Sequence, residues 1–155
     1  MAPAISQTGE YPPSAFCFKV AFALYPQMDT SFQEVSGIGS EITFKDIAEG
    51  GENRYKHRLP TSVKHPLLSL KRGIADLKSP LVIWCKTILE GDFIAPIVPQ
   101  PLLVYLLDAN QAPLRGWSFA NAYPVKWEIE SFNSTKNEVA IEKIDLSYNY
   151  SNRIV

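Results

Sequence analysis

Residues 15–25, AFCFKVAFALY, carry the clearest structural pattern in the chain. Bulky apolar side chains occupy every second position, and smaller or mixed side chains lie between them. Because successive side chains of a β-strand point to opposite faces, this alternation predicts a strand with one face in a core. The predicted core face consists of Phe16, Phe18, Val20, Phe22 and Leu24.

The last third of the chain is also rich in predicted strands. Residues 102–108 and 114–119 flank a turn, and residues 125–129 place apolar side chains at odd positions. In the final segment, 137–150, the apolar positions change from odd to even. A one-residue slip of this kind predicts a bulge near residues 142–143, or a strand that passes from one sheet into another.

Glycine and proline residues interrupt the predicted strands in the middle of the chain. Residues 31–44 predict a bent strand or a strand pair, in which Gly37 and Gly39 indicate a bulge or a close backbone approach. Residues 54–59 predict a further strand, which Pro60 is expected to end. These segments, with the others, predict a small barrel or sandwich.

One helix is expected, at residues 80–90. Ser79 can cap it, Pro80 suits the first helical position, and Gly91 can end it. Apolar residues at helical spacing form a stripe that must pack on a sheet. This stripe consists of Leu81, Trp84, Cys85 and Ile88.

Length and composition bound the class of protein. The chain has 155 residues, of which 46% are hydrophobic and 20% are charged, values typical of one folded domain. Residues 1–14 contain three prolines and a glycine and predict an extended arm. The single domain is therefore expected to span residues 15–155.

The charge balance argues against two kinds of partner. The net charge is -1, with 15 lysines and arginines against 16 aspartates and glutamates, which disfavours nucleic-acid-specific binding and a polybasic membrane surface. No apolar run approaches the roughly 18 residues of a membrane span, and the first residues lack a signal-peptide pattern. We therefore expect a protein made in the cytoplasm, with Cys17 and Cys85 as thiols rather than a disulfide.

Side chains that could carry catalysis are sparse and scattered. Neither His57 nor His65 lies in a zinc-binding motif, and no catalytic residue, cofactor site or metal ligand is predicted. Glu128 and Glu130 share one face of a predicted strand, which solvated charges explain more simply than an acid–base pair. The residues favour a β-rich assembly unit. Two other classes stay open: a hydrolase that uses these glutamates or a histidine, and a small β-barrel module that binds a ligand or peptide.

Five short motifs, in order along the chain, resemble segments of the contractile-tail inner tube proteins. Residues 32–41, FQEVSGIGSE, resemble the F-x-E-V-S-G segment of that family, and residues 49–53, EGGEN, resemble its EGG-x-N loop. The others are LKRG at 70–73, W-x-F-x-x-A-x-P at 117–124 and E-x-I-x-L-x-Y at 142–148. Together they cover nearly the whole chain at family-like intervals.

This family comprises phage tail tubes and the tubes of extracellular contractile injection systems, with haemolysin-coregulated protein as a distant relative. The resemblance implies two packed antiparallel sheets forming a β-barrel-like core, one flanking α-helix and an extended inter-subunit loop. It implies hexameric rings that stack head-to-tail inside a sheath, penetrate a target envelope and conduct cargo. The implied partners are further copies of the chain, the sheath protein, baseplate and tube-terminating proteins, and lumen cargo, without cofactor or catalytic residues. The particle would be a virion, a released extracellular particle or a membrane-anchored system.

The resemblance also indicates which residues meet other proteins. Residues 49–59 correspond to the extended loop that reaches neighbouring subunits, and alternate basic residues there are expected to meet acidic residues of a neighbour. The predicted interface residues are Glu49, Gly50, Gly51, Glu52, Asn53, Arg54, Lys56 and Arg58. Because the lumen of these tubes is lined by sheet, Lys86 and Glu90 on the helix are predicted to face the sheath.

Overall fold

The computed structural model describes residues 17–24, 28–48, 50–51, 56–74, 78–94, 96–130 and 140–155. The predicted arm at 1–14 and Phe16 of the first predicted strand lie outside these ranges. The elements are β1 (Cys17–Phe22), β2 (Met28–Phe32), β3 (Glu34–Ser36), β4 (Glu41–Ile47), β5 (His57–Lys64), β6 (Leu68–Gly73), α1 (Pro80–Leu89), β7 (Gln100–Leu107), β8 (Pro113–Ile129), β9 (Ile141–Ser147) and β10 (Tyr150–Arg153).

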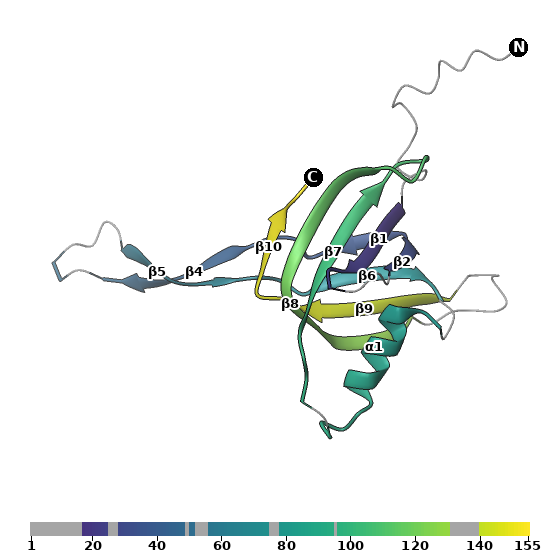
Figure 1. Ribbon diagram of the computed structural model, residues 1–155. Coiled ribbons are helices and arrows are strands. Elements are labelled where there is room, and N and C mark those ends of the chain that lie inside the picture. Colours follow the sequence, from purple (N-terminus) through teal and green to yellow (C-terminus); the bar gives the residue numbers. More distant parts are fainter. Residues whose placement is uncertain are drawn as a thin grey trace, which may run out of the picture.

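The predicted fold class is confirmed: the chain is mainly β, and one helix flanks the strands within the described ranges (Figure 1). Antiparallel pairing links the strands in the order β2-β1-β7-β8-β9-β6-β3, with β10 also paired to β8. Along the described part of the chain this order does not close into a barrel. Its two ends are nevertheless neighbours in sequence, since Gln33 alone separates β2 from β3.

The long strand β8 divides this arrangement into two packed sheets. The first part of β8 pairs with β7 and β10, and its second part pairs with β9. The strand changes direction where Asn121 has a φ of 52° and where the register with β9 shifts between Pro124 and Lys126. We call β2, β1, β7, β10 and the first part of β8 sheet A, and the second part of β8 with β9, β6 and β3 sheet B.

The hydrophobic core lies between the two sheets and under α1. It includes Val20, Phe22, Phe32, Leu102, Val104 and Phe119 from sheet A, Leu68, Leu70, Ile144 and Leu146 from sheet B, and Leu81 and Cys85 from α1. Cys17 and Cys85 are not joined in a disulfide, as expected.

The predicted core face of the first strand is confirmed in part. Val20 and Phe22 are buried, and Phe18 is half-buried against the core. Leu24 is 68% exposed, so its prediction as a core residue was wrong. The alternation continues to Leu24 in the sequence, but β1 ends at Phe22 and no longer holds later side chains against sheet B.

A further expectation about strands was wrong. Pro60 lies inside β5, opposite Phe44, rather than ending a strand. Both strands of a two-stranded ribbon are edge strands, and an edge tolerates a residue that cannot donate a backbone hydrogen bond.

The expected bulge near residues 142–143 is absent from β9, which keeps a continuous register with β6 from Ile141 to Leu146. Glu142 itself occupies a core position, in phase with Ile144 and Leu146. The apparent slip arose because a charged residue filled one place in an otherwise apolar row. The alternative expectation holds further on: the chain passes from sheet B to sheet A where β9 gives way to β10.

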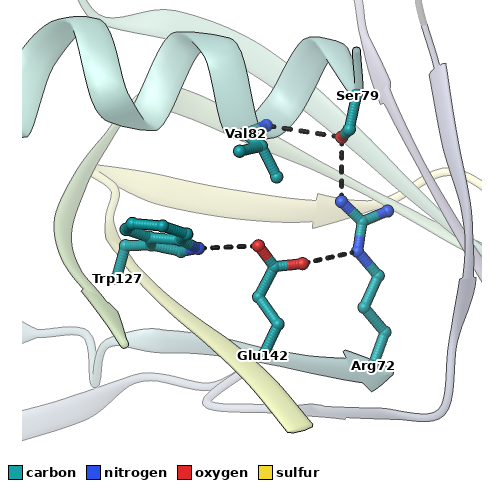
Figure 2. Close-up of polar contacts among 5 residues, drawn as sticks. All are labelled: Arg72, Ser79, Val82, Trp127 and Glu142. Atoms are coloured by element: carbon teal, nitrogen blue, oxygen red, sulfur yellow. Dashed lines mark hydrogen bonds and ion pairs between the residues drawn. The ribbon is translucent and has the colours of Figure 1, made fainter. Parts of the chain in front are cut away.

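Glu142 is held by a buried polar network (Figure 2). Its Oε2 atom accepts a hydrogen bond from Arg72 Nε at 3.0 Å, and the two side chains are 2% and 5% exposed. Its Oε1 atom accepts a hydrogen bond from Trp127 Nε1 at 2.7 Å. The Arg72 guanidinium also lies 4.4 Å from the ring centroid of Phe32. One ion pair therefore connects β6, β9, β8 and β2.

The same network holds the beginning of α1. Arg72 Nη2 donates to Ser79 Oγ at 2.8 Å, and Ser79 Oγ accepts from the backbone N–H of Val82 at 3.4 Å. The predicted cap at Ser79 and start at Pro80 are confirmed, and the helix ends at Leu89. Helix capping and a contact with β6 thus act on a single hydroxyl group.

Removing one member of the buried pair should destabilise the fold strongly. We expect Glu142→Ala to lower the free energy of unfolding by about 3–5 kcal/mol, because it leaves the Arg72 charge buried without its carboxylate. The control is Glu128→Ala, which removes the ion pair with Lys126 at 3.2 Å on the protein surface. That change should cost no more than about 1 kcal/mol. If urea denaturation shows the same loss of unfolding free energy for both variants, the proposed importance of the buried Arg72–Glu142 pair is wrong.

Candidate subunit-interface ribbon

Strands β4 and β5 form a two-stranded ribbon that extends from one side of the body (Figure 1). The chain leaves sheet B after β3, runs out along β4 and returns along β5 to β6. Every residue of β5 is exposed. An isolated two-stranded ribbon is marginally stable in water, so a further contact would stabilise this one.

The base of the ribbon is fixed by close backbone packing. Gly37 has a φ of 90°, and a Cβ atom there would overlap the carbonyl oxygen of Leu67. The Tyr148 hydroxyl donates to the Gly37 carbonyl oxygen at 2.7 Å. His65 Nδ1 lies 2.8 Å from the Gly39 carbonyl oxygen, and its ring lies beside that of Tyr148. The predicted close backbone approach is thus confirmed at Gly37.

One face of the ribbon is apolar and exposed. Residues directly opposite each other in an antiparallel pair share a face, and here Ile42 faces Val63 while Phe44 faces Pro60. Ile42, Phe44 and Val63 are 57%, 52% and 59% exposed. These four residues, which we call the apolar ribbon face, form a continuous surface of the kind that protein interfaces cover.

A charged pair lies beyond the apolar ribbon face. Arg58 is opposite Asp46, with 3.9 Å between Nε and Oδ1, and its guanidinium lies 4.9 Å from the ring centroid of Phe44. Arg58 thus meets a carboxylate of its own chain, and its contact with an acidic residue of a neighbour stays a prediction. The pair is exposed and holds the guanidinium over the aromatic ring.

The opposite face of the ribbon is polar near the body. The hydroxyl groups of Thr43 and Ser62 are 2.6 Å apart, and those of Thr43 and Thr61 are 3.0 Å apart. Glu41 and Lys64 are opposite each other at the first pair. The two faces therefore differ in chemistry although both are exposed.

The structure describes half of the residues that the sequence analysis assigned to the interface. Gly50 and Gly51 lie at a turn, where the Gly51 φ of 91° suits glycine, and Lys56 and Arg58 are exposed. The others, Glu49, Glu52, Asn53 and Arg54, lie outside the described residues. Sequence reasoning missed the apolar ribbon face, because alternation at residues 42–46 also fits a strand whose apolar side is buried.

The predicted sheath-facing residues differ in exposure. Lys86 is half-buried, with Nζ 5.8 Å from the ring centroid of Trp127. Glu90 is exposed and forms the C-terminal cap of α1. A groove of about 330 Å³ lies beside the helix, between residues that include Phe22, Ile83 and Trp84.

The structure does not bring the candidate catalytic side chains together into one site. Glu128 pairs with Lys126 at 3.2 Å, and Glu130 pairs with Lys71 at 3.1 Å. The hydrogen bond to Glu130 holds the pKa of Lys71 above its usual value. Within the described ranges, no three histidine, cysteine or acidic side chains gather to hold a metal ion, and no helix is long and apolar enough to cross a membrane.

Comparison with known proteins gives one family match. Residues 14–152 match the family described as T4-like virus tail tube protein gp19. None of the curated proteins matches the chain.

Several solved structures share the fold. A chain of the anti-feeding prophage (AFP) baseplate, 6-fold symmetrised, is 25% identical with a TM-score of 0.73, over 99% of this chain and 97% of that one. A chain of the PVC sheath-tube complex in the extended state, from an extracellular contractile injection system, is 20% identical with a TM-score of 0.70, over 99% of both chains. Hcp1 from Salmonella typhimurium is 10% identical with a TM-score of 0.55, over 90% and 85%.

The two glycines at the base of the ribbon should respond differently to alanine. Gly37→Ala should lower the free energy of unfolding by about 1–3 kcal/mol or more, because alanine is strained at this φ and its methyl group meets the Leu67 carbonyl. At Gly39 nothing lies within 4 Å of the added Cβ. Gly39→Ala should leave stability unchanged or raise it by about 0.4–1 kcal/mol. Thermal denaturation of both variants checks the sign of each effect, and a tolerated Gly37→Ala would contradict the description of the base.

Proposed function

The chain belongs to the T4-like virus tail tube protein gp19 family and is a structural subunit of an inner tube, and from this premise we propose that the β4–β5 ribbon joins neighbouring copies. In this proposal six copies form a ring, and rings stack head-to-tail inside a contractile sheath. The apolar ribbon face carries the proposal, because it is exposed on an element that extends away from the body. Head-to-tail contacts join two different patches of one chain and build an open filament.

Burying the apolar ribbon face against a neighbour is expected to stabilise the assembly by several side chains' worth of hydrophobic free energy. Full burial of a side chain such as Ile42, Phe44 or Val63 is worth about 1.5–3 kcal/mol. The ribbon would also be supported along its length once a neighbour packs on it. Because every subunit in a ring repeats the contact, moderate energies per subunit can hold a long polymer together.

Charged residues of the same segment would set the register of the contact. Lys56 and Arg58 are exposed, Arg58 lies beside Phe44, and Gly50 and Gly51 lie at a turn after β4. We include Glu49, Glu52, Asn53 and Arg54 in the proposed interface on their sequence alone. Exposed ion pairs are worth about 0–1 kcal/mol each, so they would orient the ribbon more than they hold it.

The remaining surfaces would meet the other parts of the apparatus. We propose that Lys86 and Glu90 on α1 face the sheath, and that the ends of the tube meet baseplate and tube-terminating proteins. The structural neighbours support this: their descriptions name an AFP baseplate, a PVC sheath-tube complex and a PVC sheath/tube terminator. The role would be mechanical: the chain would be made in the cytoplasm and incorporated in a particle that drives its tube through a target envelope and conducts cargo.

The proposed contact through the apolar ribbon face can be tested with one substitution on that face and a control substitution at the adjacent residue. Phe44→Ser should abolish tube formation, because it removes the largest side chain from the proposed contact. It should change the stability of the unassembled chain by no more than about 1 kcal/mol, since Phe44 is exposed there. Sedimentation and negative-stain microscopy measure assembly, and urea denaturation measures stability.

The control is Lys45→Ser, which alters the adjacent residue on the opposite face of the ribbon. This variant should form tubes as the unmodified chain does. Tubes of normal length and yield from Phe44→Ser would rule out the proposed contact.

The proposed contact between α1 and the sheath can be tested by reversing an exposed charge on the helix without changing the core. Glu90→Lys should prevent the sheath protein from assembling around the tube and leave bare tubes unchanged, because Glu90 is exposed at the end of α1. Lys86→Glu should have the same effect but also removes the contact with the Trp127 ring, so its stability must be measured in parallel. Normal sheathed particles from Glu90→Lys would show that this end of α1 does not face the sheath.

A further inference from the structure

The connection between α1 and β7 exposes large apolar side chains at a strained turn. The Ile94 N–H donates to the Gly91 carbonyl oxygen at 3.0 Å, and the two residues between them, Asp92 and Phe93, have φ values of 49° and 57°. Glycine and asparagine dominate turns of this class, because a positive φ is unfavourable for a bulky side chain. Phe93 and Ile94 are nevertheless 83% and 89% exposed. The turn therefore holds two large apolar side chains in water at a conformational cost, which indicates a contact that offsets it.

Phe93 lines two hollows of the surface. One, of about 290 Å³, lies between the end of α1 and the chain that leads to β7, and the other, of about 280 Å³, reaches the second part of β8. Both linings are mainly apolar. Contiguous exposed apolar surfaces of this kind mark sites of protein interaction. The acceptor patch, as we call it, consists of Ile88, Leu89, Phe93, Ile94, Ile97 and Val125.

The ribbon of the same chain does not cover the acceptor patch. The ribbon extends to one side of the body, whereas α1 and the turn that follows it lie on another side (Figure 1). Each chain therefore carries one protruding apolar surface and one hollowed apolar surface, in different places. If the ribbon of one copy meets the acceptor patch of the next, the contact is heterologous, and its repetition covers both surfaces of every copy inside the assembly.

The charges at the edges of the two apolar surfaces are complementary. Lys56 and Arg58 are exposed on the ribbon, and the Arg58 side chain stays 72% exposed although Asp46 lies 3.9 Å away. Asp92 is exposed at the acceptor patch, next to Phe93 in the sequence. Opposite charges beside two apolar surfaces favour one orientation of the contact, because the reverse orientation would leave them apart.

We propose that the acceptor patch receives the apolar ribbon face of a second copy of this chain. This inference rests on the proposed function, which gives the ribbon a contact between copies but no surface to receive it. The contact would remove Ile42 and Phe44 of one copy from water together with Phe93 and Ile94 of the other. The cost of the strained turn is then offset in the assembly, where its two apolar side chains are covered.

Cross-linking between introduced cysteines tests this contact. The background is Cys17→Ser with the buried Cys85 retained, and its own cross-linking is measured first. The test chain carries Ile42→Cys on the apolar ribbon face and Ile94→Cys on the acceptor patch. The matched control combines Ile42→Cys with Ile83→Cys, because Ile83 is 51% exposed on α1 but lies outside the acceptor patch. Tubes of each chain are treated with a short bismaleimide, and the products are separated on a denaturing gel.

We expect the test chain to give a ladder of dimers, trimers and longer products, because each copy is joined to the next through two different cysteines. Chains with Ile42→Cys alone or Ile94→Cys alone should stay monomeric on the gel, and the control pair should lose the ladder. If tubes of the test chain give no ladder, or the control pair gives an equal one, the proposal is wrong. Dimers without longer products would indicate a symmetric contact between like surfaces, which also overturns it.

The two proposals fail in different ways. Normal tubes from Phe44→Ser would refute the proposed contact through the ribbon, and with it this inference. If Phe44→Ser prevents tubes but the test chain forms tubes without a ladder, the ribbon meets another surface, and only this inference is wrong. If the test chain itself failed to form tubes, Val63→Cys with Phe93→Cys would join the same two surfaces. That pair is then judged by the same products, against Val63→Cys with Ile83→Cys.

Discussion

The ion pair between Arg72 and Glu142 joins three strands of sheet B to α1 and to Phe32 of β2. Taking two charges out of water costs several kcal/mol per ion, and a good ion-pair geometry with further hydrogen bonds is needed to offset it. Trp127 and Ser79 supply such hydrogen bonds. Because these residues come from β6, β9, β8 and the helix cap, the charges are satisfied when sheet B and α1 have docked together.

This requirement explains why the helix sits where it does. An apolar stripe alone can slide over an apolar sheet, since hydrophobic contact has no direction. The guanidinium of Arg72 instead reaches the one hydroxyl group that also caps α1, so the start of the helix is tied to a particular point on sheet B. The core under the helix, with Leu81 and Cys85 fully buried, then completes the docking.

A firmly held body and an extended ribbon suit the mechanical role proposed for the tube. The buried pair and the bend of β8 hold the two sheets together, while the apolar ribbon face stays exposed until another surface covers it. The base links the ribbon to the body through the close approach of Gly37 to the Leu67 backbone and a hydrogen bond from the Tyr148 hydroxyl. In the proposed tube, force on the ribbon would therefore pass directly into sheet B.

Features that local physics controls could be predicted from the amino-acid sequence. The alternation in residues 15–25 placed Val20 and Phe22 in the core, Ser79 and Pro80 marked the start of the helix, and the ordered motifs indicated the family. Which side of an alternating strand is covered depends on contacts between segments that are distant in the sequence. Glu142 lies in the core because Arg72, 70 residues away, meets it there, and Phe44 is exposed because β4 leaves the body. Alternation records that two faces differ, but only the packing of distant segments determines which face is shielded from water.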